Sequence, residues 1–86
     1  MARYALDIKP SARKELERLS DKLLAHLVSR IDGLVVNPRP FGYKKLRGYK
    51  DLWRIRVGDY RVVYIIDDDH KTVSVTRVAH RGDVYE

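Results

Sequence analysis

The 86-residue chain contains no cysteine and only three prolines and five glycines. Without cysteine, the protein can form neither a disulfide scaffold nor a Cys-rich zinc site, and thiol catalysis and redox switching are excluded. No apolar run approaches the ~18 residues of a membrane-spanning helix, and the N-terminus lacks the pattern of a secretory signal. We therefore expect a cytoplasmic protein with no membrane partner.

The length and composition predict a single domain over residues 1–86. A chain of this size buries only roughly 60 to 65% of the surface that its unfolded form exposes, which is enough for one modest core. Apolar residues make up 44% of the chain and charged residues 35%, a balance typical of folded domains and too even for a disordered chain.

Positive charge is concentrated in one part of the sequence. The chain has 18 Lys and Arg against 12 Asp and Glu, and residues 39–61 hold the whole excess of +6. The basic residues of this segment are Arg39, Lys44, Lys45, Arg47, Lys50, Arg54, Arg56 and Arg61. Such a patch attracts polyanions, nucleic acid above all. A solvated surface or a docking site for an acidic protein remains the alternative.

The N-terminal half has the pattern of one strand and two helices. Apolar residues alternate over residues 3–9, which predicts a short strand. Pro10 suits the first turn of a helix, and apolar residues then recur at intervals of four and three as far as Leu19. Ser20 is a favourable N-cap for a second, longer helix, which Pro38 ends. So short a connection predicts a helical hairpin with one shared apolar face.

From residue 46 onward the apolar pattern has a period of two. Residues 53–57 and 60–66 alternate, and Gly58-Asp59 between them suits a two-residue hairpin turn of type II′. A third run, residues 72–79, is rich in Val and Thr. The predicted fold is therefore α+β, in the order β-α-α-β-β-β, with the N-terminal strand and the helical hairpin packed on a small antiparallel sheet.

The predicted turn fixes how the two strands pair. If Gly58 and Asp59 form the loop, Arg56 lies opposite Arg61, and Arg54 shares their face of the sheet. Like charges directly opposite one another destabilise a strand pair by up to about 1 kcal/mol. Two explanations stay open. The arginines spread into water or are covered by acidic residues of the C-terminus, or they hold a phosphodiester, which planar guanidinium groups bind well.

The C-terminal segment adds polar residues to the same place. If residues 72–79 return beside residues 60–66, the end of that strand lies near Arg61. His80, Arg81 and Tyr85 would then converge on the arginines from a separate segment, as in an active site on a small sheet. An ordinary solvated terminus is the alternative.

Three motifs occur together in this half of the chain. They are Lys45-Leu46-Arg47-Gly48, the run Trp53-Arg54-Ile55-Arg56-Val57-Gly58-Asp59-Tyr60-Arg61, and the terminal Val78-Ala79-His80-Arg81-Gly82-Asp83-Val84-Tyr85. Together with the preceding strand and helical hairpin, these motifs resemble the RelE/ParE superfamily of toxins from prokaryotic toxin–antitoxin pairs, and above all its RelE branch.

The resemblance implies an endonuclease that cuts mRNA in the ribosomal A site, needs no metal or other cofactor, and is held inactive by a cognate RelB-like antitoxin. It assigns the scissile phosphate to Arg54 and Arg56 and the stabilisation of the transition state to Arg61. It assigns the leaving group to Arg81 and the activation of the attacking hydroxyl to Tyr85. The residues expected to add substrate contacts are Lys44, Lys45, Arg47, Lys50 and His80.

Cleavage of RNA without a metal uses the 2′-hydroxyl as nucleophile, so it needs a base, a stabiliser of negative charge and a proton donor. Nearby guanidinium groups would favour the phenolate form of Tyr85, which makes it the candidate base. Arginine stands at two positions where well-studied members have lysine, and it stabilises charge without shuttling a proton. His80 or a ribosomal group is left as proton donor. Residues 67–69 are acidic but lack the spacing of a calcium loop, so no metal site is predicted.

Two other functions remain. The ParE branch has the same fold without ribonuclease activity and acts by binding DNA gyrase. A non-catalytic basic module would bind nucleic acid, or only its antitoxin. The grouping of three arginines with Arg81 and Tyr85 favours the nuclease, because a protein that only binds has no need of a phosphate site completed by a tyrosine.

Overall fold

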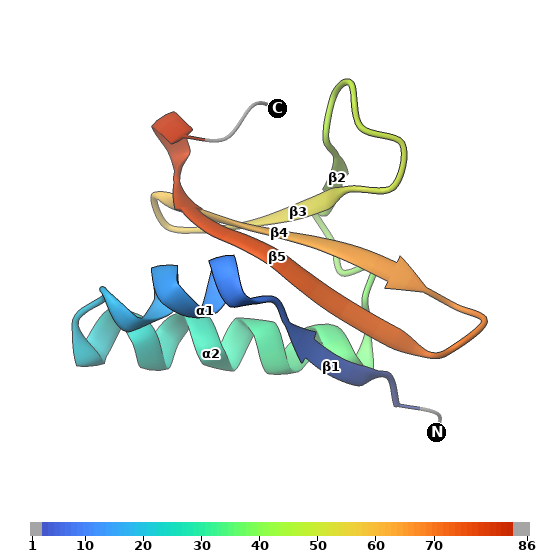
Figure 1. Cartoon of the computed structure of the whole chain (residues 1–86), viewed down its shortest axis with the longest axis horizontal. Helices are drawn as coiled ribbons and strands as arrows, with labels where there is room; N and C mark the ends of the chain where they lie inside the picture. The colour runs from blue at the N-terminus through green and yellow to red at the C-terminus, as the bar shows by residue number, and fades with distance from the viewer. Residues whose placement is uncertain (1–2, 84–86) are drawn as a thin grey trace.

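A computed structural model describes residues 3–83. Its elements are β1 (Ala5–Ile8), α1 (Pro10–Glu17), α2 (Asp21–Val36), β2 (Lys44–Lys45), β3 (Trp53–Val57), β4 (Tyr60–Asp67), β5 (Thr72–His80) and a 3₁₀ turn, η1 (Arg81–Asp83). The two helices cover one face of a five-stranded sheet with the order β1-β5-β4-β3-β2 (Figure 1). The predicted α+β fold is confirmed. No helix within residues 3–83 is long and apolar enough to cross a membrane.

The helices begin and end where the sequence indicates. Pro10 occupies the first turn of α1, and the backbone N–H of Leu23 donates to the Ser20 hydroxyl at 3.3 Å, which caps α2. The second helix stops at Val36, because Asn37 precedes a proline and is extended (φ −143°). The shared apolar face of the hairpin then packs against the sheet, with Leu27 fully buried.

The first strand joins the sheet in parallel with the first half of β5, so the sheet is mixed. The alternating apolar pattern of residues 3–9 predicted a strand but neither its partner nor its direction. After Ile8 the chain turns into α1, which covers the edge of β5 that β1 leaves open. Glu15 accepts a hydrogen bond from the N–H of Val78 at 2.8 Å, and the Ser11 hydroxyl donates to the carbonyl of Thr76 at 2.8 Å. These side chains satisfy backbone groups that an open sheet edge would leave unpaired.

The predicted hairpin register is confirmed. Val57 lies opposite Tyr60 and Arg56 lies opposite Arg61. Gly58 has φ +62°, a conformation that a type II′ turn requires at its first loop residue and that glycine adopts without strain. The return of β5 along β4 is also as expected, with Arg61 opposite Ala79. The C-terminal end of β5 therefore lies beside the β3–β4 turn.

The two faces of the sheet are buried by different groups. The face under the helices holds the main core, in which Tyr64, Val62, Val73 and Val75 are fully buried. The opposite face has a smaller set of buried side chains. These are Leu46, Val63 and Ala79 together with two charged residues, Arg54 and Arg61.

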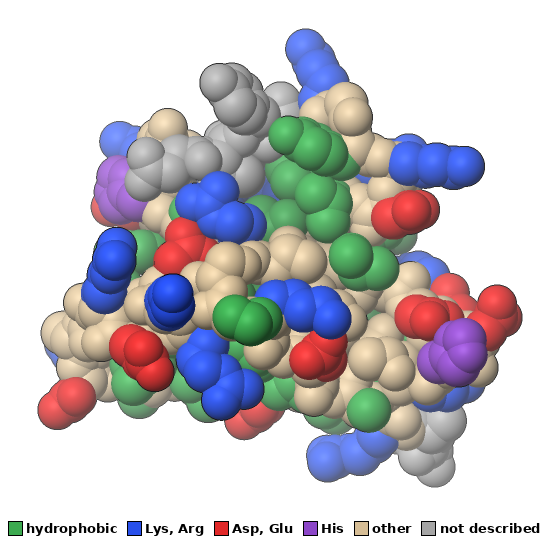
Figure 2. Space-filling model, in the orientation of Figure 1, with side chains coloured by type: hydrophobic (Ala, Val, Ile, Leu, Met, Phe, Trp, Pro, Cys, Tyr) green, Lys and Arg blue, Asp and Glu red, His purple; other side chains and the backbone are tan. Residues whose placement is uncertain are grey.

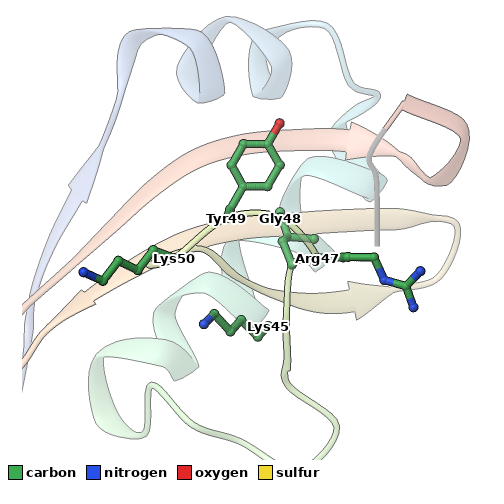
Figure 3. A pocket seen from close by; sticks show the side chains of 6 residues that line it. Lys45, Arg47, Gly48, Tyr49 and Lys50 are labelled. Carbon is green, nitrogen blue, oxygen red and sulfur yellow. The ribbon is translucent and has the colours of Figure 1, made fainter.

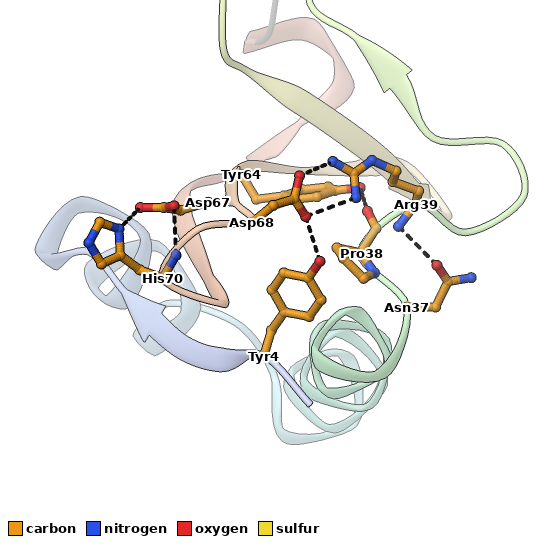
Figure 4. Close-up of polar contacts among 8 residues, drawn as sticks. All are labelled: Tyr4, Asn37, Pro38, Arg39, Tyr64, Asp67, Asp68 and His70. Atoms are coloured by element: carbon orange, nitrogen blue, oxygen red, sulfur yellow. Dashed lines mark hydrogen bonds and ion pairs between the residues drawn. The ribbon is translucent and has the colours of Figure 1, made fainter. Parts of the chain in front are cut away.

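A polar cluster fastens the linker between α2 and β2 to the sheet (Figure 4). Arg39 donates to both carboxylate oxygens of Asp68, at 2.7 and 3.2 Å, and the Tyr4 hydroxyl donates to the same carboxylate at 2.5 Å. The Tyr64 hydroxyl donates to the carbonyl of Pro38 at 2.7 Å. The linker is thus held to β4 and to the β4–β5 turn.

The same contacts remove Arg39 from the predicted basic patch. Arg39 was counted with the basic segment, but it is neutralised by Asp68 at the other end of β4 from Arg61. Hydrogen bonds from Arg39, and next from Tyr4, lower the pKa of Asp68 to about 2. Burial raises the pKa of Tyr64 well above its ordinary value. This cluster is therefore structural, and the candidate site lies elsewhere.

Candidate functional site

Three arginines occupy the sheet face that the helices leave uncovered. Pairing in β3 and β4 places Arg54, Arg56 and Arg61 on that face, as predicted. Arg54 is only 4% exposed and Arg61 only 5%, whereas Arg56 is exposed. The explanation that all three spread into water is therefore wrong for two of them. Arg54 and Arg61 form a buried, positively charged floor, and Arg56 stands at its accessible edge.

Local packing explains how two guanidinium groups are accommodated. The buried residue Val63 lies directly opposite Arg54, and Ala79 lies directly opposite Arg61, so small apolar side chains adjoin the aliphatic stems. Arg54 Nη1 donates to the carbonyl of Gly42 at 3.5 Å. Gly42 belongs to the linker that the Arg39–Asp68 contact holds in place. The polar cluster thus helps to position Arg54.

A fourth cation reaches the same end of the sheet from η1. The N–H of Arg81 donates to the carbonyl of Asp59 at 2.7 Å, which ties the segment after β5 to the β3–β4 turn. Arg81 is exposed and lies at the same end of the sheet as Arg56 and Arg61. The predicted convergence is present for Arg81. Tyr85 lies outside the described residues.

His80 does not join this group. It pairs with Tyr60, on the helix-covered side of the sheet, and its ring meets the Tyr60 ring edge-on with centroids 5.6 Å apart. Directly opposite residues of antiparallel strands share a face, and Ala79 takes the position beside Arg61. The expectation that His80 contacts a substrate at the arginine face is therefore not met.

The four other expected substrate-binding residues divide between two places. Lys44 pairs with Arg54 and so lies on the arginine face, whereas Lys45 pairs with Trp53 and lies on the other. Arg47 and Lys50 are exposed in the loop over residues 46–52. All but Lys44 line an open pocket of about 460 Å³ formed by residues 45–50 (Figure 3).

Sequence reasoning overlooked Tyr49, which lines this pocket between Arg47 and Lys50. Its side chain is 50% exposed, although tyrosine is an aromatic residue that a small core would normally use. The available signal was an aromatic residue directly after a glycine and between two cations, in a segment with no strand or helix period.

Charge is distributed unevenly over the surface. Acidic side chains gather over the β4–β5 turn at the right of Figure 2, and basic ones lie at the top, over the loop between β2 and β3. Within the acidic turn, Asp67 and Asp68 are engaged by neighbours. His70 donates its backbone N–H to Asp67 at 3.0 Å, which is the largest cause of the lowered pKa of Asp67. Residues 3–83 contain no group of three or more His, Cys, Asp or Glu side chains placed to hold a metal ion.

Comparison with known proteins places these features in a family. A family model described as the ParE toxin of the type II toxin–antitoxin system parDE matches residues 6–85. The chain belongs to the RelE/ParE family of toxins. Toxin RelE of Mycobacterium tuberculosis is 37% identical to it over 83 residues, which covers 95% of this chain and 86% of the relative. Toxin RelG of the same organism is 36% identical, covering 95% of both chains.

Solved structures of RelE/ParE toxins have the same fold. The toxin–antitoxin complex RelBE2 of Mycobacterium tuberculosis matches with a TM-score of 0.81 and 34% identity, over 92% of this chain and 99% of the other. The RelE–RelB complex of Pyrococcus horikoshii matches with a TM-score of 0.80 and 30% identity, over 98% and 100%. The protein is therefore the toxin component of a type II toxin–antitoxin system, as its motifs predicted.

Proposed function

We propose that this toxin is a ribosome-dependent endoribonuclease that cuts mRNA in the ribosomal A site without a metal. The observation that carries the proposal is the convergence of cations from three elements, with Arg56 on β3, Arg61 on β4 and Arg81 on η1 at one end of the sheet. A phosphodiester under attack by its own 2′-hydroxyl gains negative charge, and preorganised cations lower the energy of that state.

The arginines take different roles because their exposure differs. Arg56, which is exposed, contacts the scissile phosphate directly. Arg54 and Arg61 act from the buried floor, where a lower dielectric strengthens the attraction between a cation and developing negative charge. Arg81 stabilises the leaving 5′ oxygen. None of the four serves as a proton shuttle, since arginine stays protonated.

Tyr85 is the base in this scheme, and its phenolate takes the proton of the attacking 2′-hydroxyl. The requirement for that hydroxyl restricts the reaction to RNA. His80 has no role here, because its ring packs on Tyr60 on the other side of the sheet. The proton for the 5′ oxygen then comes from outside residues 3–83, for example from a ribosomal group.

The partner in the inactive state is a RelB-like antitoxin. The similar RelBE2 and RelE–RelB structures are complexes of a toxin with its antitoxin. The +6 net charge of this chain supports a partner with acidic residues, because complementary charge accelerates and orients association. A free toxin would otherwise act on the messages of its own cell.

Primer extension on a reporter message in a translating extract tests the proposal. Wild-type protein should produce cuts within codons only while the message is translated. Arg56→Ala and Tyr85→Phe should lower the cleavage rate by about 100-fold or more, since lost transition-state charge or lost base catalysis has effects of this size. Lys22→Ala, which removes an exposed cation on α2, serves as the matched control and should cut at the wild-type rate.

A second candidate function follows from the family model, which is described as a ParE toxin. In that case the protein inhibits DNA gyrase by binding and leaves mRNA intact. A supercoiling assay with purified gyrase separates the two functions. Intact messages together with growth arrest and blocked supercoiling would replace the nuclease by the gyrase inhibitor.

A further inference from the structure

Tyr49 has no part in the chemistry proposed above, yet its ring is held out from the surface. It lies in the β2–β3 loop and lines an open pocket with Arg47 and Lys50. In Figure 3 the ring stands out from the loop, with Arg47 on one side and Lys50 on the other.

Local hydrogen bonds define the backbone of the loop that carries this ring. Leu46, at its start, is 4% exposed and donates its N–H to the carbonyl of Leu52 at 2.9 Å, which closes the base of the loop. The N–H of Tyr49 donates to the carbonyl of Leu46 at 3.4 Å, and Gly48 between them has φ +81°. A type II turn requires this conformation at its third residue. A ligand that contacts the ring therefore meets a side chain on an ordered backbone.

The surroundings of the ring are cationic. Lys45, Arg47 and Lys50 carry three positive charges, and residues 45–50 include no acidic residue. Exposed aromatic rings among cations are typical of surfaces that bind single-stranded nucleic acid, because the ring stacks on a base while the cations hold the adjacent phosphates.

The loop adjoins the arginine face. Leu46 pairs with Leu52, and Lys44, two residues earlier, pairs with Arg54. The loop therefore begins two residues from Arg54, about 7 Å along the strand. In Figure 1 the loop and η1 both stand on the side of the sheet that the helices do not cover. The loop lies at the end of β3 away from Arg56, so an RNA strand that runs from the arginines along β3 would reach Tyr49.

We propose that Tyr49 stacks on an unpaired base of the mRNA bound at the arginine face, while Arg47 and Lys50 hold neighbouring phosphates. This inference rests on the proposed nuclease function and adds a substrate subsite to it. The ring contacts a base and not the reacting atoms, so Tyr49 is a binding residue. Stacking tolerates every base, since each has a π-face, and the subsite contributes affinity more than codon choice.

Single-turnover cleavage on ribosomes programmed with a defined A-site codon tests the subsite. Tyr49→Ala should raise the toxin concentration needed for half-maximal rate by about 5- to 150-fold, the equivalent of about 1 to 3 kcal/mol of base stacking, and leave the maximal rate within about twofold. Tyr49→Phe and Tyr49→Trp should retain wild-type affinity. Tyr49→Leu, which keeps apolar bulk but has no ring, should behave like Tyr49→Ala.

A second arm identifies the base. Each nucleotide of the codon and its neighbours is replaced in turn by an abasic site, and the effect of Tyr49→Ala is measured on every message. One abasic position should abolish the difference between wild type and Tyr49→Ala. If no position does so, the ring does not stack on the message and the proposal is overturned.

The remaining outcomes are also decisive. Wild-type cleavage that Tyr49→Ala leaves unchanged overturns the subsite alone, even if that variant loses affinity for the antitoxin. If the wild-type protein cuts no message, the nuclease proposal fails and the subsite fails with it. Thermal unfolding of each variant checks the fold, which a change at a half-exposed loop position should leave intact.

Discussion

Single residues of this toxin carry charge in two different settings. Arg54 and Arg61 are buried among small apolar side chains, whereas Arg39 is exposed and paired with Asp68. Burying a charge is costly unless other groups compensate. At Asp68 the compensating partners are Arg39 and Tyr4, which makes this residue suitable for a test of stability.

Stability should fall in acid through Asp68. Its pKa is about 2 in the folded protein, below the ordinary value near 3.9, chiefly because of Arg39. A lowered pKa means that the stabilisation is complete above about pH 5 and is lost as the pH falls from about 4 towards 2. In thermal unfolding, Asp68→Asn should have a lower Tm than wild type at pH 7, and the difference should shrink towards pH 2. Asp69→Asn, an exposed carboxylate in the same turn, should follow wild type at every pH.

At the scale of elements, the β3–β4 hairpin organises the site. Its two-residue turn fixes the register that gathers the arginines on one face, and β5 returns along β4 to bring Arg81 beside the turn. A register shifted by one residue would exchange the two faces of a strand. The conformation of Gly58 is therefore a condition for both the sheet and the site.

Two glycine substitutions should have opposite effects on stability. A Cβ at Gly58 or at Gly33 would meet no atom within 4 Å, so only backbone conformation distinguishes the two positions. Gly58 has φ +62°, and Gly58→Ala should cost about 1 to 2 kcal/mol. Gly33 lies within α2, and Gly33→Ala should stabilise by about 0.5 to 1 kcal/mol. Urea denaturation measures both, and a loss of stability in Gly33→Ala would contradict this explanation.

Across the whole molecule, acidic and basic side chains gather over different segments. The β4–β5 turn is acidic, with Asp67 and Asp68 engaged by His70 and Arg39, and the β2–β3 loop is basic. This separation gives the protein one surface that attracts polyanions and another that repels them. An RNA strand would therefore approach from the loop side.

The affinity of the protein for RNA should depend on salt through the loop cations. With a short 2′-O-methyl RNA, which cannot be cleaved, the logarithm of the affinity should fall linearly with the logarithm of salt concentration, with a slope of about −0.7 per neutralised phosphate. Arg47→Ala should make the slope shallower by about 0.7, whereas Lys22→Ala on α2 should leave it unchanged. Fluorescence anisotropy measures the slope, and equal slopes in all three proteins would exclude Arg47 from the RNA-binding surface.

Local patterns in the sequence determined much of this structure. The limits of both helices, the turn at Gly58 and the register of the hairpin follow from interactions between residues close in the chain, such as caps, proline effects and alternation. The shared face of Arg54, Arg56 and Arg61 follows from that register alone. The toxin family also followed from the sequence, because its motifs lie in these locally determined segments.

Only the tertiary structure decided the remaining features. These features depend on residues that are distant in the chain, and an alternating pattern contains no information about such partners. They are the parallel pairing of β1, the contact of Arg39 with Asp68 and the burial of Arg54 and Arg61. His80 shows the same limit, since a register irregularity between Val63 and Tyr64 lies between the β4–β5 turn and the end of β5. Because one extra residue moves a side chain to the other face of a sheet, the position of His80 was set by the folded β4–β5 pair.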